Sequence, residues 1–322
     1  MKAMVFSEYG SANMIHPEQL DKPTPKNNQV LIKLKACSIN DWDWGLLTGK
    51  PLVNRMLCGI FRPKRISVLG SDIAGIIESV GQDVKSFKVG DEVIGDLCGK
   101  QWGGFAEYVS TTEDLLTLKP SNMTFEDAAA LPQAATLAWQ GLTNKNQLSA
   151  NDKILINGAG GGSGSFAIQI AKYFGAEVTA VDSSEKLEFM KSLGADHVID
   201  YKTCDFTQNE VRYDVILDLM GHHKLFSYRK SLTKTGRYLL VGGASELIFN
   251  VLLLGPLLSL FSEKQMSILV HEPTKGLNEL KELYKTKKIK PIIDRCFPFN
   301  EVPSAMEYFG QRKTKGKIVI TI

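Results

Sequence analysis

The stretch that decides the fold runs from residue 154 to residue 164 and reads Ile154-Leu155-Ile156-Asn157-Gly158-Ala159-Gly160-Gly161-Gly162-Ser163-Gly164. An apolar run breaks into glycines, and a helical pattern follows with Phe166, Ile170 and Phe174 on one face. The order of strand, tight glycine turn and helix is typical of a dinucleotide-binding unit. Glycines let the backbone approach a pyrophosphate, and the N-terminus of the helix offers free N–H groups to its charge.

The glycine pattern and the acidic residue beyond it place the cofactor contacts. In the register Gly-x-Gly-x-x-Gly, Ala159 takes the first position and is followed by Gly161 and Gly164. We expect these three residues and Gly162 to contact the cofactor. A second apolar run ends at Asp182, where a carboxylate is expected to hold a ribose hydroxyl. The alternative is a flexible glycine loop without a ligand, which the spacing disfavours.

Composition and charge exclude several classes of protein. The 322 residues suggest two domains, and 43% hydrophobic with 23% charged residues is typical of a globular chain. The 38 basic and 35 acidic residues are too balanced to favour nucleic acid as a partner. The five cysteines are scattered without a Cys-x-x-Cys pair, which predicts free thiols in a reducing compartment. Since the N-terminus shows no signal-peptide pattern, we expect a cytoplasmic protein.

The pattern of apolar, polar and glycine residues changes twice along the chain. Residues 1–122 carry short alternating runs punctuated by glycines, which predicts a compact β-rich domain. Thr124 has the pattern of a helix N-cap, and apolar runs alternate with helical stretches from there to residue 270. The expected strands of this region are 153–157, 177–181, 197–199, 213–218, 237–241 and 267–270. We therefore predict an α/β, doubly wound parallel sheet over 123–270. The tail 271–322 is too short to fold alone and is expected to return to the first domain.

Two segments are unusual for a surface. The Leu-rich run 247–261 is too short to span a bilayer, and we interpret it as a buried or interface segment, with a membrane-surface patch as the alternative. Residues 49–65 mix five cations with apolar side chains. We expect a solvated helix or loop there; the alternatives are a cover for the active site or a contact with an acidic surface.

Several motifs together resemble the medium-chain dehydrogenase/reductase superfamily, and most closely its zinc-independent quinone oxidoreductase branch. The resemblance spans nearly the whole chain and rests on Gly70-Ser71-Asp72-Ile73-Ala74-Gly75, Val89-Gly90-Asp91-Glu92-Val93, Gly103-Gly104-Phe105-Ala106-Glu107-Tyr108, Asn157 to Gly164 and Leu193-Gly194-Ala195-Asp196. It implies a Rossmann domain inserted in a GroES-like catalytic domain. It also implies reduction of quinones, or of the C=C bond of enals and enones, by NADPH.

The same resemblance addresses the zinc site. Zinc-dependent relatives hold the metal with a Cys, a His and a second Cys, and these positions fall here on Asn40, on Ser71 and near Gln133. Amide and hydroxyl groups are poor zinc ligands, so we predict no bound metal. Without a Lewis acid, alcohol oxidation is hard, whereas a quinone or enone is already polarised. The predicted function is hydride transfer from NAD(P)H to such an acceptor. The alternatives are a catalytically weak NADPH-binding interaction protein at a membrane surface and, least favoured, a zinc-dependent alcohol dehydrogenase.

The resemblance assigns further roles. Asn40 and Asp43 lie in the loop next to the nicotinamide and are the predicted catalytic residues; a plain turn is the alternative. Trp42 and Trp44 are expected either to line a binding site for an aromatic substrate or to pack in the core. Thr136 corresponds, within one position, to a residue that packs against the nicotinamide; a simple helix residue is the alternative. Gly242-Gly243 follow a strand, at the end where ligands bind in open α/β sheets, so we expect them to let the nicotinamide approach; a plain turn is the alternative.

The residues near the end of the second apolar run bear on the preference between NADP(H) and NAD(H). Asp182 favours NAD(H) by repelling a 2′-phosphate, whereas Ser183, Lys186 and Tyr201 occupy positions where NADPH-using relatives place phosphate contacts. We predict NADP(H), with NAD(H) as the alternative. The expected partners are a small hydrophobic carbonyl or quinone substrate, with no nucleic acid, and the protein is expected to be a homodimer or a monomer.

Overall fold

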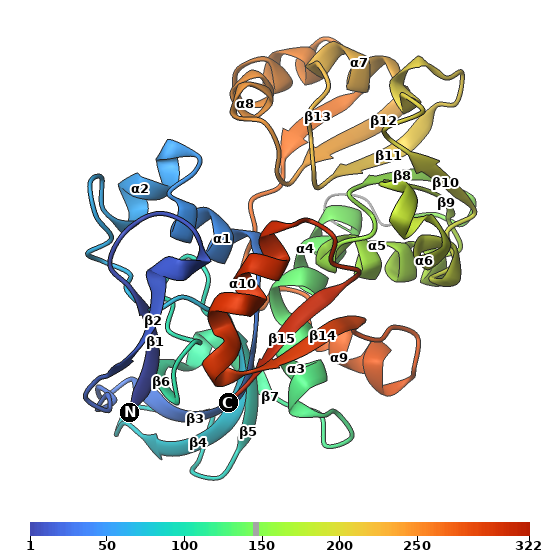
Figure 1. Cartoon of the computed structure of the whole chain (residues 1–322). Helices are drawn as coiled ribbons and strands as arrows, with labels where there is room; N and C mark the ends of the chain where they lie inside the picture. Colours follow the sequence, from blue (N-terminus) through green and yellow to red (C-terminus); the bar gives the residue numbers. More distant parts are fainter. Residues whose placement is uncertain (144–147) are drawn as a thin grey trace. The chain divides into compact units, whose positions relative to one another are not determined.

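The computed structural model describes residues 1–143 and 148–322, which form two compact units (Figure 1). Unit 1 comprises Met1–Thr136, Pro273–Lys285 and Pro291–Ile322, and unit 2 comprises Leu137–Glu272 and Thr286–Lys290. One unit is therefore inserted in the other. The main division follows Thr136, whereas the sequence placed it after residue 122. Helix α3 (Phe125–Ala130) packs onto the strands of unit 1, which keeps this segment with the first unit.

Unit 1 is built on a seven-stranded sheet. Its order is β14-β15-β3-β4-β5-β7, with β6 also paired to β3. The strands are β3 (Gln29–Ser38), β4 (Asp72–Val80), β5 (Glu92–Asp96), β6 (Tyr108–Thr112), β7 (Leu116–Leu118), β14 (Ile293–Pro298) and β15 (Lys317–Thr321). A separate two-stranded sheet joins β1 (Lys2–Phe6) to β2 (Ile15–Gln19). Because β3 pairs with β4, β6 and β15, most of its side chains are buried.

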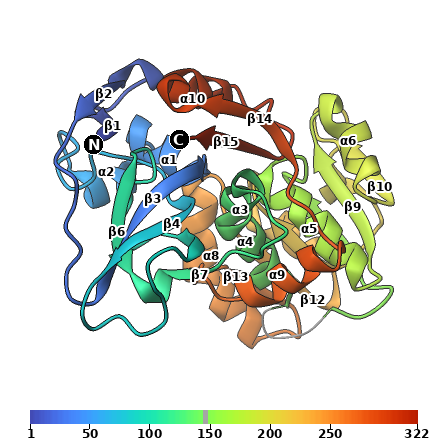
Figure 2. The same cartoon turned by 90° about the horizontal axis from the view of Figure 1, so that it is seen from below.

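The helices of unit 1 surround this sheet. They are α1 (Asp41–Thr48), α2 (Leu52–Cys58), α3, the first turn of α4 (Pro132–Thr143), α9 (Leu277–Lys285) and α10 (Val302–Gly310). The predicted cap of α3 is confirmed, because Thr124 Oγ1 accepts a hydrogen bond from the backbone N–H of Asp127 over 3.1 Å. Helix α10 packs against β14 and β15, as a second view also shows (Figure 2).

Unit 2 contains the predicted doubly wound sheet. Its six strands are all parallel and run in the order β10-β9-β8-β11-β12-β13, which is the two-halves Rossmann arrangement. They are β8 (Lys153–Asn157), β9 (Glu177–Asp182), β10 (His197–Asp200), β11 (Tyr213–Asp218), β12 (Leu232–Leu240) and β13 (Gln265–Ile268). The helices are α5 (Gly162–Tyr173), α6 (Leu187–Ser192), α7 (Leu225–Lys230) and α8 (Ser245–Leu260). Short 3-10 turns lie at Ala12–Met14, Glu113–Leu115, Ser184–Lys186, Phe206–Gln208 and Phe299–Glu301.

The Leu-rich run differs from its favoured interpretation. It forms α8, in which only Leu247, Val251 and Gly255 are buried. The exposed apolar side chains are Phe249, Leu252, Leu253, Leu254, Leu257, Leu260 and Phe261. An interface or a membrane-surface patch therefore stays a prediction, whereas a fully buried segment is wrong. In the part of the chain that the structure describes, none of the helices has the length and apolar character that crossing a membrane requires.

Candidate active site

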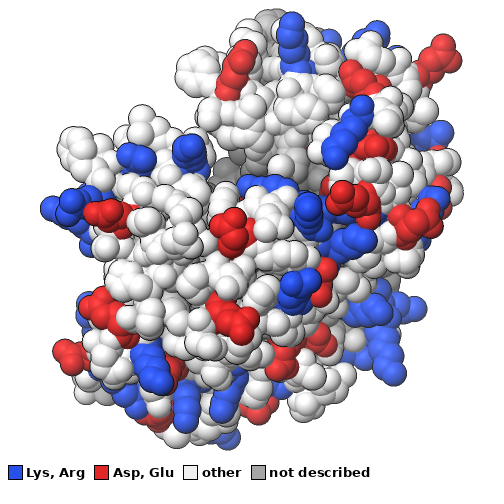
Figure 3. Space-filling model, viewed as in Figure 1, with Lys and Arg blue, Asp and Glu red and all other residues white. Residues whose placement is uncertain are grey.

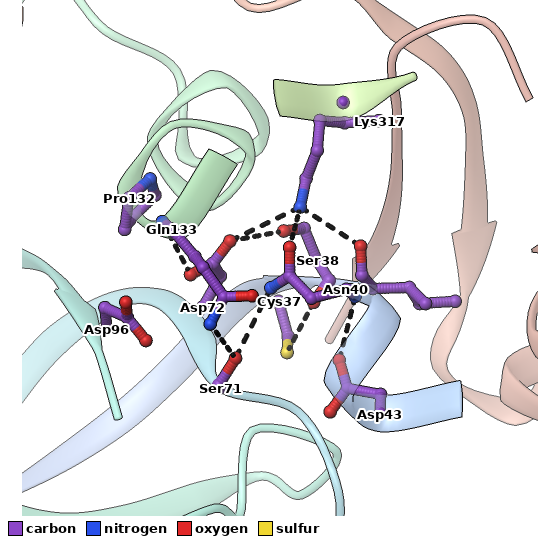
Figure 4. Close-up of polar contacts among 12 residues, drawn as sticks. Cys37, Ser38, Asn40, Asp43, Ser71, Asp72, Asp96, Pro132, Gln133 and Lys317 are labelled. Carbon is purple, nitrogen blue, oxygen red and sulfur yellow. Dashed lines mark hydrogen bonds and ion pairs between the residues drawn. The ribbon is translucent and has the colours of Figure 1, made fainter. Parts of the chain in front are cut away.

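Three residues that the sequence aligned with zinc-ligand positions lie together inside unit 1 (Figure 4). Asn40 precedes α1, Ser71 precedes β4 and Gln133 lies in the first turn of α4. The Nδ2 atom of Asn40 donates to Ser71 Oγ over 3.3 Å, and Gln133 Nε2 donates to the same oxygen over 3.5 Å. All three side chains are buried. The fold thus converts three distant positions into one polar cluster.

A buried lysine holds this cluster in place. Lys317 begins β15 and is only 3% exposed, and its Nζ donates to Asn40 Oδ1 over 2.6 Å and to the carbonyl oxygen of Ile39 over 3.0 Å. Because an ammonium group can only donate, it must face the oxygen of the Asn40 amide. The amide nitrogen of Asn40 is therefore turned toward Ser71.

Buried carboxylates surround the lysine. Asp72 Oδ2 lies 3.4 Å from Lys317 Nζ and accepts from Ser38 Oγ over 3.1 Å, while Asp72 Oδ1 accepts from the backbone N–H of Gln133 over 3.0 Å. Burial, reinforced by the charge of Asp72, holds the pKa of Asp96 well above its ordinary value. The positive charge of Lys317 thus offsets negative charge in this buried acidic region.

The Asp43 carboxylate binds backbone N–H groups of unit 1 through both of its oxygens. Its Oδ2 accepts from the backbone N–H of Asn40 over 2.8 Å, and its Oδ1 accepts from the backbone N–H of Gly70 over 2.8 Å. The first bond is half of a capping box at the start of α1. Burial raises the pKa of Asp43 to about 7, although the two N–H groups act in the opposite direction. The geometry favours a positioning role for Asp43, and its predicted catalytic role stays a prediction.

The donor set of this cluster does not fit zinc. Two amides and a hydroxyl stand where a zinc site needs thiolate and imidazole. The Lys317 ammonium, 2.6 Å from Asn40 Oδ1, would also repel a divalent cation at this place. Within residues 1–143 and 148–322, no three His, Cys, Asp or Glu side chains gather as metal ligands do.

The two tryptophans near the cluster have separate roles. Trp44 packs against the core of unit 1. Trp42 is 40% exposed and lines a cavity of about 600 Å³ together with Trp102, Leu57 and Arg65. A cavity of this size with aromatic walls suits a small hydrophobic molecule.

The glycine turn of unit 2 has the geometry of a phosphate cradle. The N–H groups of Gly158 and Ala159 both donate to the carbonyl oxygen of Val181, which ties the turn to β9. Gly161 is the N-cap residue of α5, and Gly162 is its first residue. A Cβ on Gly164 would lie 2.4 Å from the carbonyl oxygen of Gly158, so only glycine fits there. A Cβ on Gly161 would meet nothing closer than 3.6 Å, so the space above this glycine is open to a ligand.

Asp182 is already engaged at the end of β9. Its Oδ2 accepts from the N–H of Gly160 over 2.9 Å, and its Oδ1 accepts from the N–H of Ser183 over 2.8 Å. Lys186 Nζ lies 3.4 Å from Asp182 Oδ1, and both side chains are largely buried. The charge with which Asp182 would repel a 2′-phosphate is thus offset by Lys186.

The other predicted cofactor residues are spread over both units. Tyr201 follows β10, is half exposed and donates its backbone N–H to the carbonyl oxygen of Asp182. Gly242 and Gly243 follow β12, and a Cβ on Gly243 would lie 2.3 Å from the carbonyl oxygen of Gly221. This close approach explains the glycine without a ligand. Thr136 is buried in unit 1 and donates its hydroxyl to the carbonyl oxygen of Pro132 over 2.7 Å.

Two residues next to the cofactor turn were missed by the sequence analysis. Asn157 closes β8 and Asp218 closes β11, and Asn157 Nδ2 donates to Asp218 Oδ1 over 2.8 Å. Tyr238 Oη donates to Asp218 Oδ2 over 2.8 Å, and burial raises the pKa of Asp218. These contacts fix the carboxyl ends of neighbouring strands, where ligands bind in such sheets. A polar residue at the end of each apolar run was the available signal.

Lys317 was missed as well. The available signal was a lysine directly before the apolar run Ile318-Val319-Ile320, because a lysine in a buried strand needs a partner. The sequence alone does not show which partner, because Asn40 lies 277 residues away.

Comparisons with known proteins agree with this architecture. Residues 26–121 match the family model of the alcohol dehydrogenase GroES-like domain, and residues 193–320 match that of the zinc-binding dehydrogenase. The chain is 35% identical to 2-methylene-furan-3-one reductase of Solanum lycopersicum, over 99% of this chain and 79% of that protein. It is 34% identical to the NADPH-dependent alkenal/one oxidoreductase, chloroplastic, of Arabidopsis thaliana, over the same shares.

A solved structure supports the same relationship. The quinone oxidoreductase from Coxiella burnetii superposes with a TM-score of 0.90 at 28% identity, over 100% of this chain and 99% of that chain. Both the predicted fold and the predicted resemblance are thereby confirmed. This chain belongs to the medium-chain dehydrogenase/reductase superfamily, and its relatives there are quinone oxidoreductases and alkenal reductases.

Proposed function

We propose that this protein is an NAD(P)H-dependent oxidoreductase that transfers hydride to a quinone, or to the activated C=C bond of an enal or enone, without zinc. The relatives named above support the reaction class. The observation that carries the zinc-free chemistry is the Asn40–Ser71–Gln133 cluster held by Lys317. This arrangement supplies hydrogen-bond donors where zinc-dependent relatives hold a metal.

The cluster offers what reduction of a polarised acceptor needs. Negative charge develops on the carbonyl oxygen when hydride reaches a quinone or an enone, and aligned N–H or O–H donors stabilise that charge. Asn40 presents its amide nitrogen because Lys317 holds its oxygen. The Ser71 hydroxyl accepts from both amides and retains its own proton to donate. An alcohol substrate would instead need its hydroxyl deprotonated, which this donor set does not favour.

The cofactor residues are assigned by the family resemblance together with the geometry of each unit. Ala159, Gly161, Gly162 and Gly164 would hold the pyrophosphate, because the turn exposes backbone N–H groups at the start of α5. Ser183, Lys186 and Tyr201, next to Asp182, would hold the adenosine ribose and its 2′-phosphate. Thr136, Gly242 and Gly243 would face the nicotinamide, which supplies the hydride when bound. We propose NADP(H) over NAD(H), since Lys186 offsets the charge of Asp182.

The cysteines support a cytoplasmic setting for the protein. All five cysteines are free, and Cys204 and Cys296 are exposed. Free exposed thiols suit a reducing compartment such as the cytoplasm. A homodimer or a monomer stays the prediction for the assembly, and light scattering on the purified chain tests it.

The reaction is tested by following NADPH and NADH oxidation with 9,10-phenanthrenequinone and with a 2-alkenal, in the presence and absence of EDTA. We expect turnover that EDTA does not change and that NADPH supports better than NADH. Turnover lost to EDTA would contradict the zinc-free assignment. Tight NADPH binding without turnover would instead favour the catalytically weak binding protein.

A variant pair tests the role of the cluster. Asn40→Leu removes one donor, and losing a single such donor lowers kcat by about 100-fold or more. Asn28→Leu changes an exposed asparagine of the same unit and should leave kcat unchanged. Equal activity of the two variants would contradict the role of Asn40.

A further inference from the structure

Residues 50–65, here called the α2 arm, expose apolar side chains between cations. Helix α2 and the turn after it carry six exposed apolar residues, which are Leu52, Val53, Met56, Leu57, Ile60 and Phe61. Phe61 is 90% exposed and Leu52 is 70% exposed. Leaving six neighbouring apolar side chains in water is unfavourable, so the surface indicates an occupant.

The arm is held firmly on its opposite side. Asn54 and Cys58, one helical turn apart, are buried; Asn54 Nδ2 donates to the carbonyl oxygen of Lys50 over 2.9 Å, and Cys58 Sγ donates to that of Ile66 over 3.3 Å. The guanidinium of Arg55 stacks over the ring of Tyr9 at 4.6 Å. The apolar face is therefore presented by an anchored segment, so little order has to be gained on binding.

The charge of the arm is of one sign. Lys50, Arg55, Arg62, Lys64 and Arg65 lie within it, and no Asp or Glu occurs between residues 44 and 71. One acidic side chain, Glu8, lies 3.7 Å from Arg62. The space-filling view shows mainly white and blue groups over α2 (Figure 3). An anionic surface is the electrostatic complement of such a segment.

We propose that the α2 arm docks on an anionic lipid bilayer. Apolar side chains enter the boundary between headgroups and acyl chains, while the cations stay among the anionic headgroups. A nucleic acid would leave the six apolar side chains in water, and an acidic protein surface would match the cations without burying those side chains. Helix α8 also exposes apolar residues, but its one charged residue is Glu246, so charge does not favour the same ligand there.

Docking has a consequence for the cavity of unit 1. Leu57 and Arg65 belong to the arm and also line the cavity of about 600 Å³. A docked arm would bring this cavity next to the bilayer surface. The docking itself does not depend on the proposed reaction, because it is measured by binding alone.

The test is cosedimentation of the full chain with vesicles of phosphatidylcholine, or of phosphatidylcholine and phosphatidylserine in equal parts. We expect binding to the anionic vesicles that weakens as salt is added, and little binding to the neutral ones. Phe61→Ser should weaken binding about tenfold or more, because it removes a large apolar group from the buried face. Arg62→Gln/Lys64→Gln should weaken it roughly 30-fold, since each cation near an anionic surface contributes about fivefold.

Matched variants outside the arm show whether a loss of vesicle binding is caused by the arm itself. Phe226→Ser removes a phenylalanine that is 60% exposed on α7, and Lys85→Gln/Lys88→Gln removes two exposed cations of unit 1. Both should bind vesicles like the parent chain, and circular dichroism checks that every variant is folded. The proposal is overturned if the parent chain does not bind anionic vesicles, or if the control variants lose as much vesicle binding as the arm variants. It is also overturned if Phe61→Ser abolishes a concentration-dependent dimer but leaves vesicle binding unchanged.

Discussion

Replacing Lys317 by Met should destabilise unit 1 more than almost any other single change. The substitution keeps an unbranched side chain of similar length but removes the cation that lies 3.4 Å from Asp72 Oδ2. Asp72 is fully buried, so water cannot replace the lost partner. Breaking a buried ion pair by removing one partner costs about 3–5 kcal/mol. For a unit of this size, that loss lowers the Tm by roughly 6–20 °C.

The chain supplies a matched control for this experiment. Lys119 is also buried, with Nζ 2.9 Å from Glu92 Oε2, but Glu92 is 44% exposed. Lys119→Met should therefore cost only about 1–2 kcal/mol, from lost hydrogen bonds, because water can solvate the carboxylate that remains. The double variant Lys317→Met/Asp72→Asn removes both charges and should recover at least half of the loss in Tm.

Thermal unfolding followed by circular dichroism and by calorimetry measures all four proteins. The reasoning would be refuted if Lys317→Met unfolded within a few degrees of the parent chain. It would also be refuted if Lys119→Met cost as much, or if Asp72→Asn gave no recovery. Lys317→Arg keeps the charge in a bulkier group and reports whether the charge or the fit of the side chain matters more.

Three further outcomes are expected. Gly161→Ala should fold normally, since its Cβ would meet nothing within 3.6 Å, but calorimetry should show NADPH binding at least about tenfold weaker. Gly164→Ala should instead lower the Tm, because its Cβ would lie 2.4 Å from the carbonyl oxygen of Gly158. Lys186→Ala leaves the Asp182 carboxylate without its cation, so NADPH affinity should fall about tenfold while NADH affinity changes little, and equal losses for both cofactors would contradict the assignment. Burial raises the pKa of Asp43 to about 7 in the folded state, so its protonation stabilises unit 1 fully below about pH 4, and this contribution is lost as the pH rises through about 7. The Tm of unit 1 should accordingly decline between about pH 4 and 7, and Asp43→Asn should flatten that decline; an unchanged slope in the variant would exclude Asp43 as its source.

Local patterns in the sequence predicted most of unit 2. The strands 153–157, 177–181, 197–199 and 213–218 were found within one residue, because a buried parallel strand is an apolar run with clear ends. The later strands were found less well, since β12 begins at Leu232 among polar residues and β13 begins at Gln265. The glycine turn was found because its backbone geometry demands glycine at fixed spacing.

What the sequence could not show depends on contacts between distant segments. Asn40, Ser71 and Gln133 were grouped by resemblance, but the lysine that orients them comes from the last strand of the chain. The exposure of α8 was also hidden, because a mostly apolar helix has no clear periodicity that would distinguish a buried face from an exposed one. The sequence pattern groups residues 123–136 with the later strands, whereas α3 packs onto β3 and β4, and the local pattern does not show this contact between distant segments.

The lysine of the polar cluster makes its charge a permanent part of the polypeptide. A metal-dependent site has to be loaded, competes for its ion with other proteins and loses it to a chelator, whereas an ammonium group arrives with translation and cannot dissociate. Converting this site to a zinc enzyme would consequently need more than Cys or His at positions 40, 71 and 133. It would also require position 317 to become neutral, because two positive centres cannot share one buried chamber.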